Sequence, residues 1–417
     1  MEKKSYENVQ KRRAVHKTVE ANNLMRFNDK PKLTELVPNV FPKVLNLLGI
    51  SNREDVANIR ILDSYSGKIL VHFLIPIAST RHIRGIIIDV TGEPKIVCNS
   101  FPHIHDCELD SKEFEDFEFV PSVTQVSEAK EGTILRLFFD DGEQLWTLST
   151  HKRINGWHSK WYGSSFGELF SSLWGDKDMN QLLRRDRCYI FSFSDKKNRI
   201  VCSIERSSLT LIGVSERMSN GRMKDIYPFS SIEHPLVSMT SYLPFKTKEE
   251  LKAAISKLDW QQTTGFVLSN ANYSLKVLAP HYSQMREIRG NEPNLTLRYL
   301  QLKSESRVEE LKKLYPENDY LFNKIESQLV QLPKYLAKNY RLRFIENQRL
   351  HLPKEEFSLL MKVKEEYDAN LSVEDNVQSQ FMKCRPRQLN ALIRNLPSSR
   401  EYRYEDNIFS SRNYRDY

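Results

Sequence analysis

A chain of 417 residues is too long for one small hydrophobic core, so two domains and a tail are expected. The formal charge of +8 at pH 7 favours an anionic partner but does not identify it. The five cysteines are scattered and form no CxxC pair that would suggest a zinc site or a redox dithiol, and they indicate a reduced, cytoplasmic or otherwise intracellular protein. No run approaches the roughly 20 apolar residues that a membrane helix needs, so no membrane is expected among its partners.

Composition divides the chain into four parts. Residues 1–58 combine a basic polar stretch with one short apolar segment, and we expect a basic, helical N-terminal extension. Residues 59–280 contain short runs rich in Val, Ile, Phe, Tyr and Thr between turn residues, which predicts a β-rich domain. Residues 281–397 show charged stretches with apolar residues at a 3.6-residue period, which predicts an all-helical domain. Residues 398–417 are polar and tyrosine-rich, which predicts a tail.

Helical spacing also occurs inside the β-rich part, in "SSFGELFSSLWG", and predicts an inserted helix there. The expected fold class is therefore α+β, with antiparallel sheets and inserted helices followed by a helical C-terminal domain. The predicted strands are "KILVHFLIPI", "IRGIIIDV", "PKIVCNSF", "TILRLFF", "EQLWTLST", "CYIFSFS", "NRIVCSI", "LTLIGV", "GFVLS" and "YSLKVLA".

Four segments of this β-rich part occur in a characteristic order. They are "RHIRGIIIDVTGEPKIVCNSF" (81–101), the hairpin of residues 127–157, "YIFSFSDKKNRIVC" (189–202) and "TTGFVLSNANYSLKVLAPHYSQMREIRGN" (263–291). In order and approximate spacing they resemble the bacteriophage-type ATP-dependent RNA ligase family of covalent nucleotidyltransferases. The resemblance covers most of the chain beyond residue 60, and it implies an ATP-grasp-like ligase domain followed by a helical domain.

The resemblance also implies a chemistry. In such ligases a lysine in a K-x-D-G element attacks the α-phosphate of ATP, the nucleotide passes to an RNA 5′-phosphate, and a 3′-hydroxyl displaces it. The lysine must be neutral to attack, so burial or nearby positive charge has to lower its pKa. Carboxylates on later strands hold Mg²⁺ and the ribose, and cationic side chains hold the phosphates. The implied partners are RNA or another single-stranded nucleic acid, and the implied role is RNA repair.

Two basic residues match the family's phosphate contacts. Arg84 in "RGIII" stands where the family has an arginine beside the nucleotide phosphates, a role that suits its forked donors. Lys276 retains the first lysine of a closing K-x-K element, whose second lysine is replaced by Leu278. An exposed arginine at a strand start and an exposed strand lysine are the structural alternatives.

The nucleophile position has two interpretations. "AKEGT" aligns with K-x-D-G, but Lys130 is one residue too close to Gly132 and Glu131 replaces the aspartate. Either the loop is shortened by one residue and Lys130 is the catalytic nucleophile, or Ala129 occupies the lysine position. The second is favoured, because a shift of one residue reverses the direction of a side chain on an extended strand.

The segment "STHKRING" after the hairpin resembles the family's T-K-G-S element, which would place Lys152 or Arg153 against a phosphate. In a rival alignment "RING" is the K-x-D-G element, with Arg153 in the lysine's place and Asn155 in the aspartate's. An arginine stays protonated and cannot form the adduct, so the nucleophile is compromised or in doubt in both alignments. A solvated basic loop is the structural alternative for Arg153.

Two family carboxylates are missing, because Ser192 and Thr264 stand at their positions, and we predict no metal ligand among the site residues. Two functions stay open. One is an ATP-dependent RNA ligase that uses ATP and Mg²⁺, with Lys130 as nucleophile. The other is a pseudoenzyme of nucleotidyltransferase fold that binds nucleic acid, or other proteins of an assembly, through Arg84, Lys152, Arg153 and Lys276.

Overall fold

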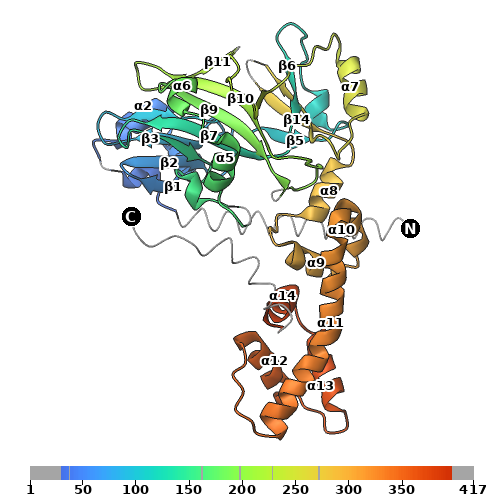
Figure 1. The fold of residues 1–417 in the computed structure, drawn as a ribbon. Coiled ribbons are helices and arrows are strands. Elements are labelled where there is room, and N and C mark those ends of the chain that lie inside the picture. Colours follow the sequence, from blue (N-terminus) through green and yellow to red (C-terminus); the bar gives the residue numbers. More distant parts are fainter. Residues whose placement is uncertain are drawn as a thin grey trace. The chain divides into compact units, whose positions relative to one another are not determined.

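The computed structural model describes residues 30–36, 38–160, 163–196, 199–227, 229–270 and 273–396. The predicted tail and most of the predicted N-terminal extension lie outside these residues. The chain divides into two compact units, Met1–Ser283 and Gln284–Tyr417. The first unit contains three sheets with their covering helices, and the second is helical (Figure 1).

The first sheet is an antiparallel meander. Its outer face packs against helices in a core that includes Val44, Leu48, Ile69 and Ile88. Its strands, in order across the sheet, are β1 (Ile59–Tyr65), β2 (Lys68–Phe73), β3 (Arg84–Asp89) and β4 (Lys95–Cys98), and the covering elements are η1 (Leu33–Glu35), α2 (Phe41–Leu48) and α3 (Arg53–Ala57).

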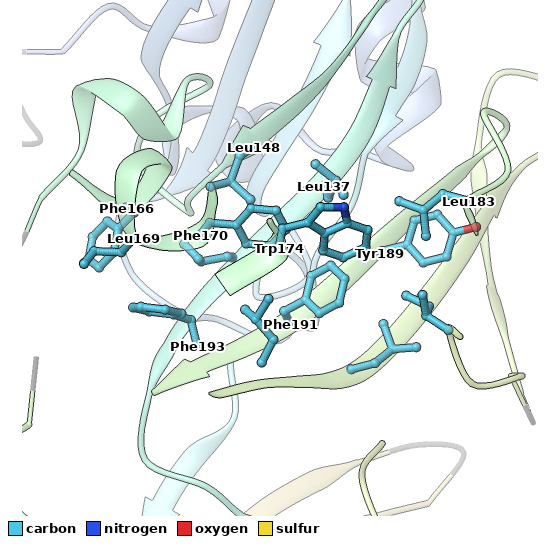
Figure 2. Packing of buried hydrophobic residues seen from close by; sticks show 14 of the residues in the cluster. Leu137, Leu148, Phe166, Leu169, Phe170, Trp174, Leu183, Tyr189, Phe191 and Phe193 are labelled. Atoms are coloured by element: carbon cyan, nitrogen blue, oxygen red, sulfur yellow. The ribbon is translucent and has the colours of Figure 1, made fainter. Parts of the chain in front are cut away.

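The second sheet forms the centre of the first unit. Its order is β11 (Met223–Ile226), β10 (Ser208–Arg217), β9 (Arg187–Ser194), β7 (Thr133–Asp140) and β8 (Leu145–Ser149), and β12 (Val237–Met239) pairs with β10. One face carries an aromatic core in which the rings of Phe170 and Trp174 stack at 5.5 Å (Figure 2). These two rings belong to α5 (Phe166–Trp174), the helix that the sequence predicts, and α6 (Met179–Leu182) follows it.

Alternation along β7 divides its side chains between the two faces of this sheet. Leu135 and Leu137 face the aromatic core. Phe138 packs on the opposite face against the first sheet, in a small core that includes Cys98 and Cys188. Arg136 alternates with the two leucines and therefore lies on the face of Phe138.

The third sheet has the order β5 (His105–Cys107), β14 (Ser274–Leu278), β13 (Gly265–Ser269) and β6 (Gln125–Ala129). One face packs in a core with the helices α4 (Lys112–Glu115) and α7 (Lys248–Ser256). The strand pairs are antiparallel except for two short parallel ones, β5 with β14 and β12 with β10. The predicted α+β class with antiparallel sheets and inserted helices is confirmed.

The helical C-terminal part is also confirmed. Its elements are α8 (Tyr282–Arg289), α9 (Leu295–Ser304), α10 (Val308–Leu314), η4 (Pro316–Asn318), α11 (Asp319–Tyr340), η5 (Arg341–Ile345), α12 (Lys354–Glu365), α13 (Val373–Met382) and α14 (Pro386–Asn395). No helix in the described part of the chain is both long and apolar enough to cross a membrane.

One predicted strand, "NRIVCSI", is wrong. Asn198 lies outside the described residues, and residues 199–207 form bends after β9 instead of a strand. The physical reason is a competing acceptor, because the backbone N–H groups of Ile200, Val201 and Cys202 donate to the carboxylate of Glu131. These N–H groups would otherwise be available to a neighbouring strand.

Candidate functional site: a cationic cluster between the sheets

Two of the predicted phosphate-binding residues meet around one carboxylate. Lys276 on β14 pairs in register with Asp106 on β5, and its Nζ lies 3.7 Å from Asp106 Oδ1. Arg84, the first residue of β3, lies close enough for the Asp106 charge to act on its pKa. Residues about 190 positions apart in the sequence are therefore neighbours, and both side chains keep partial access to solvent.

Arg136 adds a second guanidinium from the central sheet. Its side chain is fully buried, and it donates from Nη1 to the carbonyl oxygen of Gly85 and from Nη2 to that of Thr150 at 2.5 Å. Within the described part of the chain, Arg136 Nε is buried without a hydrogen-bond partner. Arg136 thus joins β3 to the end of β8 and keeps a positive charge in the interior between them.

The turn after β8 packs directly against β3. Gly85 has a φ of +70°, and a Cβ atom there would lie 2.6 Å from the carbonyl oxygen of His151, so only glycine permits this approach. The imidazole Nε2 of His151 lies 2.5 Å from Ser100 Oγ, beyond the end of β4. The "RG" of "RGIII" therefore serves two purposes, because Gly85 makes room for the turn while Arg84 provides the charge.

Three histidines surround the arginines, and all three have lowered pKa values. Burial lowers the pKa of His72 to about 4, and the charges of Arg84, Lys152 and Arg136 act in the same direction. Burial and then Arg84 lower the pKa of His151 well below its usual range, and the same causes lower that of His103. The histidines are neutral at pH 7, because further positive charge is unfavourable there.

Two cations of this region, Arg84 and Lys152, also have lowered pKa values. Burial and then Arg136 lower the pKa of Arg84. Lys152 keeps contact with solvent, but the packing around its ammonium group lowers its pKa. We name this set the cationic cluster: Arg84, Arg136, Lys152 and Lys276, with His72, His103 and His151. These positive charges would stabilise an anion bound there.

The faces of the third sheet show where the two residues considered for the predicted nucleophile position, Ala129 and Lys130, lie. Directly paired residues point to the same face, and the pairs Lys276 with Val267 and Gly265 with Ala129 place Lys276 and Ala129 on one face. The opposite face carries the core residues of this sheet. Ala129, on the strand, therefore shares its face with the cationic cluster.

Lys130 follows the end of β6 and is exposed. Its ammonium group forms an ion pair with Glu128 at 2.8 Å. Glu128 pairs with Phe266, a core residue on the opposite face from Ala129. Lys130 is thus held beside Glu128, whose side chain lies on the opposite face of the third sheet from Ala129 and Lys276.

Glu131 anchors a loop. Its carboxylate accepts hydrogen bonds from the N–H groups of Ile200, Val201 and Cys202 and from the hydroxyl of Tyr282, at 2.7 to 3.0 Å. The Glu131 carboxylate thus accepts from four donors, and it positions the segment after β9.

Arg153 lies apart from this arrangement. Its guanidinium is half exposed and pairs with Asp63 at 3.5 Å, and the same carboxylate accepts from the N–H group of Ile154. Trp157 follows in η2 (Gly156–His158) with an exposed fraction of 48%, and its ring lies against Gly167 of α5. Trp146 packs against Phe139, and Trp161 lies outside the described residues.

The two positions at which the resemblance to RNA ligases predicts carboxylates, Ser192 and Thr264, are both buried. Ser192 lies on β9, and Gly132 approaches it so closely that a Cβ atom would be 2.7 Å from Ser192 Oγ. Thr264 donates from its hydroxyl to the carbonyl oxygen of Ala129 at 2.6 Å. Each replacement therefore fits its surroundings as a neutral residue.

A resident divalent metal does not fit the described residues. They contain no group of three or more His, Cys, Asp or Glu side chains that could hold one. In "HIHDC" the rings of His103 and His105 meet at 4.9 Å, while Cys107 is buried in the core of the third sheet. Asp106, an acid beside the cationic cluster, is already paired with Lys276.

Sequence reasoning missed two members of the cationic cluster, Arg136 and His72. Each had a signal, because each is a polar residue within an apolar strand, in "TILRLFF" and "KILVHF". A buried polar side chain requires a partner and for that reason indicates a special environment.

Comparisons with known proteins give partial likenesses. No family model matches the chain. The immediate-early protein ICP-46 homolog of Invertebrate iridescent virus 3 is 25% identical over 290 residues, which cover 66% of this chain and 62% of that protein. The immediate-early protein ICP-46 of Frog virus 3 (isolate Goorha) is 23% identical over 198 residues, which cover 42% of this chain and 49% of that protein. The chain thus spans about half to three fifths of the length of these relatives.

Among solved structures, an archaeal ATP-dependent RNA ligase (form 1) is similar with a TM-score of 0.40 and 14% identity, over 88% of this chain and 81% of the ligase. A putative ATP-dependent DNA ligase from Aquifex aeolicus has a TM-score of 0.38 and 14% identity, over 80% of this chain and 89% of the ligase.

Proposed function

We propose that this chain binds the phosphates of a nucleoside polyphosphate, or the phosphorylated end of a single-stranded nucleic acid, and that it forms no lysyl adduct. The observation that carries the proposal is the approach of Arg84 and Lys276 to one acid, Asp106. The charges of Arg84, Arg136 and Lys152 also act together on one histidine, His72. Guanidinium and ammonium groups of this kind bind phosphate oxygens by charge-assisted hydrogen bonds.

The absence of an adduct rests on the face of the third sheet. The residue that shares this face with Lys276 is Ala129, while Lys130 is paired with Glu128. Since Ser192 and Thr264 replace the expected carboxylates, two electrostatic contributions to phosphoryl transfer are lost as well. Removal of one such contribution commonly costs on the order of 100-fold in rate.

The turn after β8 favours the phosphorylated end of a single-stranded nucleic acid over a free nucleotide as the ligand. Within eight residues it leads from His151 and Lys152 to the exposed ring of Trp157. An exposed indole beside cationic side chains suits the stacking of an unpaired base.

Binding is tested by titration calorimetry of the full chain with ATP, with pyrophosphate, and with single-stranded RNA that carries either a 5′-phosphate or a 5′-hydroxyl. We expect the phosphorylated RNA to bind more tightly than the hydroxyl form. Arg84→Ala and Lys276→Ala should each weaken phosphate binding by about 10- to 100-fold, the equivalent of one charged hydrogen bond. The matched control is Arg153→Ala, which removes a guanidinium paired with Asp63 and should change affinity by less than about twofold.

The ligase interpretation is tested separately, by incubation with labelled ATP and Mg²⁺ or Mn²⁺ followed by denaturing electrophoresis. We expect no covalent band. A band that disappears in Lys130→Ala but remains in Lys152→Ala would establish an ATP-dependent RNA ligase with Lys130 as its nucleophile. Failure of all the phosphate probes to bind would refute the proposal itself.

A further inference from the structure

Two thiols meet in the interior between the first and second sheets. Cys98 is the last residue of β4 and Cys188 lies near the start of β9, and both are fully buried. Their sulfur atoms are 3.5 Å apart, and the Cys188 thiol donates to the sulfur of Cys98. Because 90 positions separate the two in the sequence, no spacing motif signals the pair.

The surroundings make the two sulfurs chemically unequal. Burial alone would raise the pKa of Cys98, but the hydrogen bond from Cys188, the charge of Arg136 and a contact with Ser149 bring it to about 7. The bond that favours the Cys98 thiolate, together with burial, raises the pKa of Cys188 well above its usual range. Cys98 accepts the hydrogen bond and lies under the charge of Arg136, so it is the sulfur favoured to attack first, and Cys188 is the thiol placed to react second.

We propose that Cys98 and Cys188 are a site of reversible oxidation, at which a peroxide converts the two thiols into one intramolecular disulfide between β4 and β9. This inference does not rest on the proposed phosphate binding. It concerns the interface between two sheets, and its test requires no ligand of the cationic cluster.

The reaction balances in two steps. The Cys98 thiolate attacks one peroxide oxygen, the O–O bond breaks, and the products are a sulfenic acid on Cys98 and hydroxide. The sulfur of Cys188 then attacks the sulfenic sulfur, the S–O bond breaks, and the departing hydroxide leaves as water with the proton of the Cys188 thiol. Two thiols are oxidised and one peroxide is reduced to two molecules of water. A thiol reductant reverses the change.

The fold provides both the approach of the sulfurs and a route for the oxidant. A disulfide bond measures about 2.05 Å, so the two sulfurs must approach by roughly 1.5 Å, which small rotations of the side chains can supply. β4 has four residues and lies at the edge of its sheet, and its pairing with β3 contains a register shift. Local opening of this short edge strand would expose Cys98 to a molecule as small as a peroxide.

The test uses the full chain, reduced, freed of reductant and treated with hydrogen peroxide. The remaining thiols are alkylated in denaturant, and the intact and peptide masses are measured. We expect three alkylated cysteines instead of five, a mass lower by two hydrogen atoms before alkylation, and a peptide that joins Cys98 to Cys188. Dithiothreitol should restore five alkylated cysteines.

Variants assign the order of the steps. Cys188→Ser should stop the reaction at the Cys98 sulfenic acid, which dimedone labels, whereas Cys98→Ser should leave Cys188 unoxidised. Cys384→Ser is the matched control, since Cys384 is the one cysteine of the chain that is not buried, and it should leave the disulfide unchanged. Peroxide that leaves all five thiols alkylatable, or that joins a different pair, would overturn the proposal, and this wild-type measurement stands even where a variant fails to fold.

Discussion

The carboxylate of Glu131 offers the sharpest test of how this fold is held together. The perturbation is Glu131→Gln, which keeps the shape of the side chain and removes one acceptor oxygen and the charge. In the native protein Oε1 accepts from Ile200 and Val201, and Oε2 accepts from Val201, Cys202 and Tyr282.

The magnitude follows from these bonds. In its better orientation the glutamine amide oxygen replaces Oε2, and its NH₂ group then faces the N–H group of Ile200, 2.7 Å from Oε1 in the native protein. A buried donor left without an acceptor costs about 1–3 kcal/mol. The remaining bonds lose their charge assistance, which roughly halves each one. Together these changes predict a loss of about 2–4 kcal/mol in the free energy of unfolding of the first unit.

Differential scanning calorimetry measures the effect. We expect the unfolding transition of the first unit to move down by roughly 4–16 °C, since a unit of this size loses about 2–4 °C per kcal/mol. The control is Glu128→Gln, two residues away. Glu128 is partly exposed and paired with Lys130, so its change should cost less than about 0.5 kcal/mol. Equal midpoints for the two variants would refute the view that Glu131 holds the loop after β9.

Three further predictions concern buried features of the first unit. Gly265→Ala should destabilise by at least about 1 kcal/mol in urea denaturation, because Gly265 has a φ of +142° and a Cβ atom would lie 2.0 Å from the carbonyl oxygen of Val277; an unchanged midpoint would contradict this geometry. Lys68→Met should cost about 3–5 kcal/mol by the same measurement, because it leaves the carboxylate of Asp140 buried without its partner at 2.9 Å, and a loss under about 1 kcal/mol would show that the pair is dispensable. Acid should destabilise the fold between pH 6.5 and pH 4, because the folded-state pKa of His72 is about 4, below the usual 6.5, so that only the unfolded chain takes up a proton in this window. The 2.5-unit difference corresponds to about 3 kcal/mol lost at pH 4, and His72→Gln should flatten this part of the stability profile by that amount.

Local residue patterns determined much of the architecture. Val, Ile and Phe in short runs predicted most strands of the first unit, and the spacing of Phe166, Leu169 and Phe170 predicted α5, because burial of one face imposes its period on a strand or helix. "NRIVCSI" failed because its apolar residues fit a strand, whereas its backbone N–H groups bind Glu131. A hydrogen bond between residues about 70 positions apart leaves no periodic trace in the sequence.

The cationic cluster shows most clearly what the sequence predicts and what only the tertiary structure decides. The sequence by itself identified Arg84, Lys152 and Lys276 as candidates for phosphate binding, because charge and motif position are properties of single residues. The approach of Arg84 and Lys276 to Asp106, and the buried charge of Arg136 near Arg84, were decided only by the tertiary structure, since they depend on which strands lie side by side. The same holds for Ala129 and Lys130, because the pairing of β6 with β13 settles which side of the sheet each strand residue faces. Electrostatic interactions depend on distances in space, and the direction of a side chain on a strand depends on how the strands pair. Neither can be deduced from the order of residues along the chain.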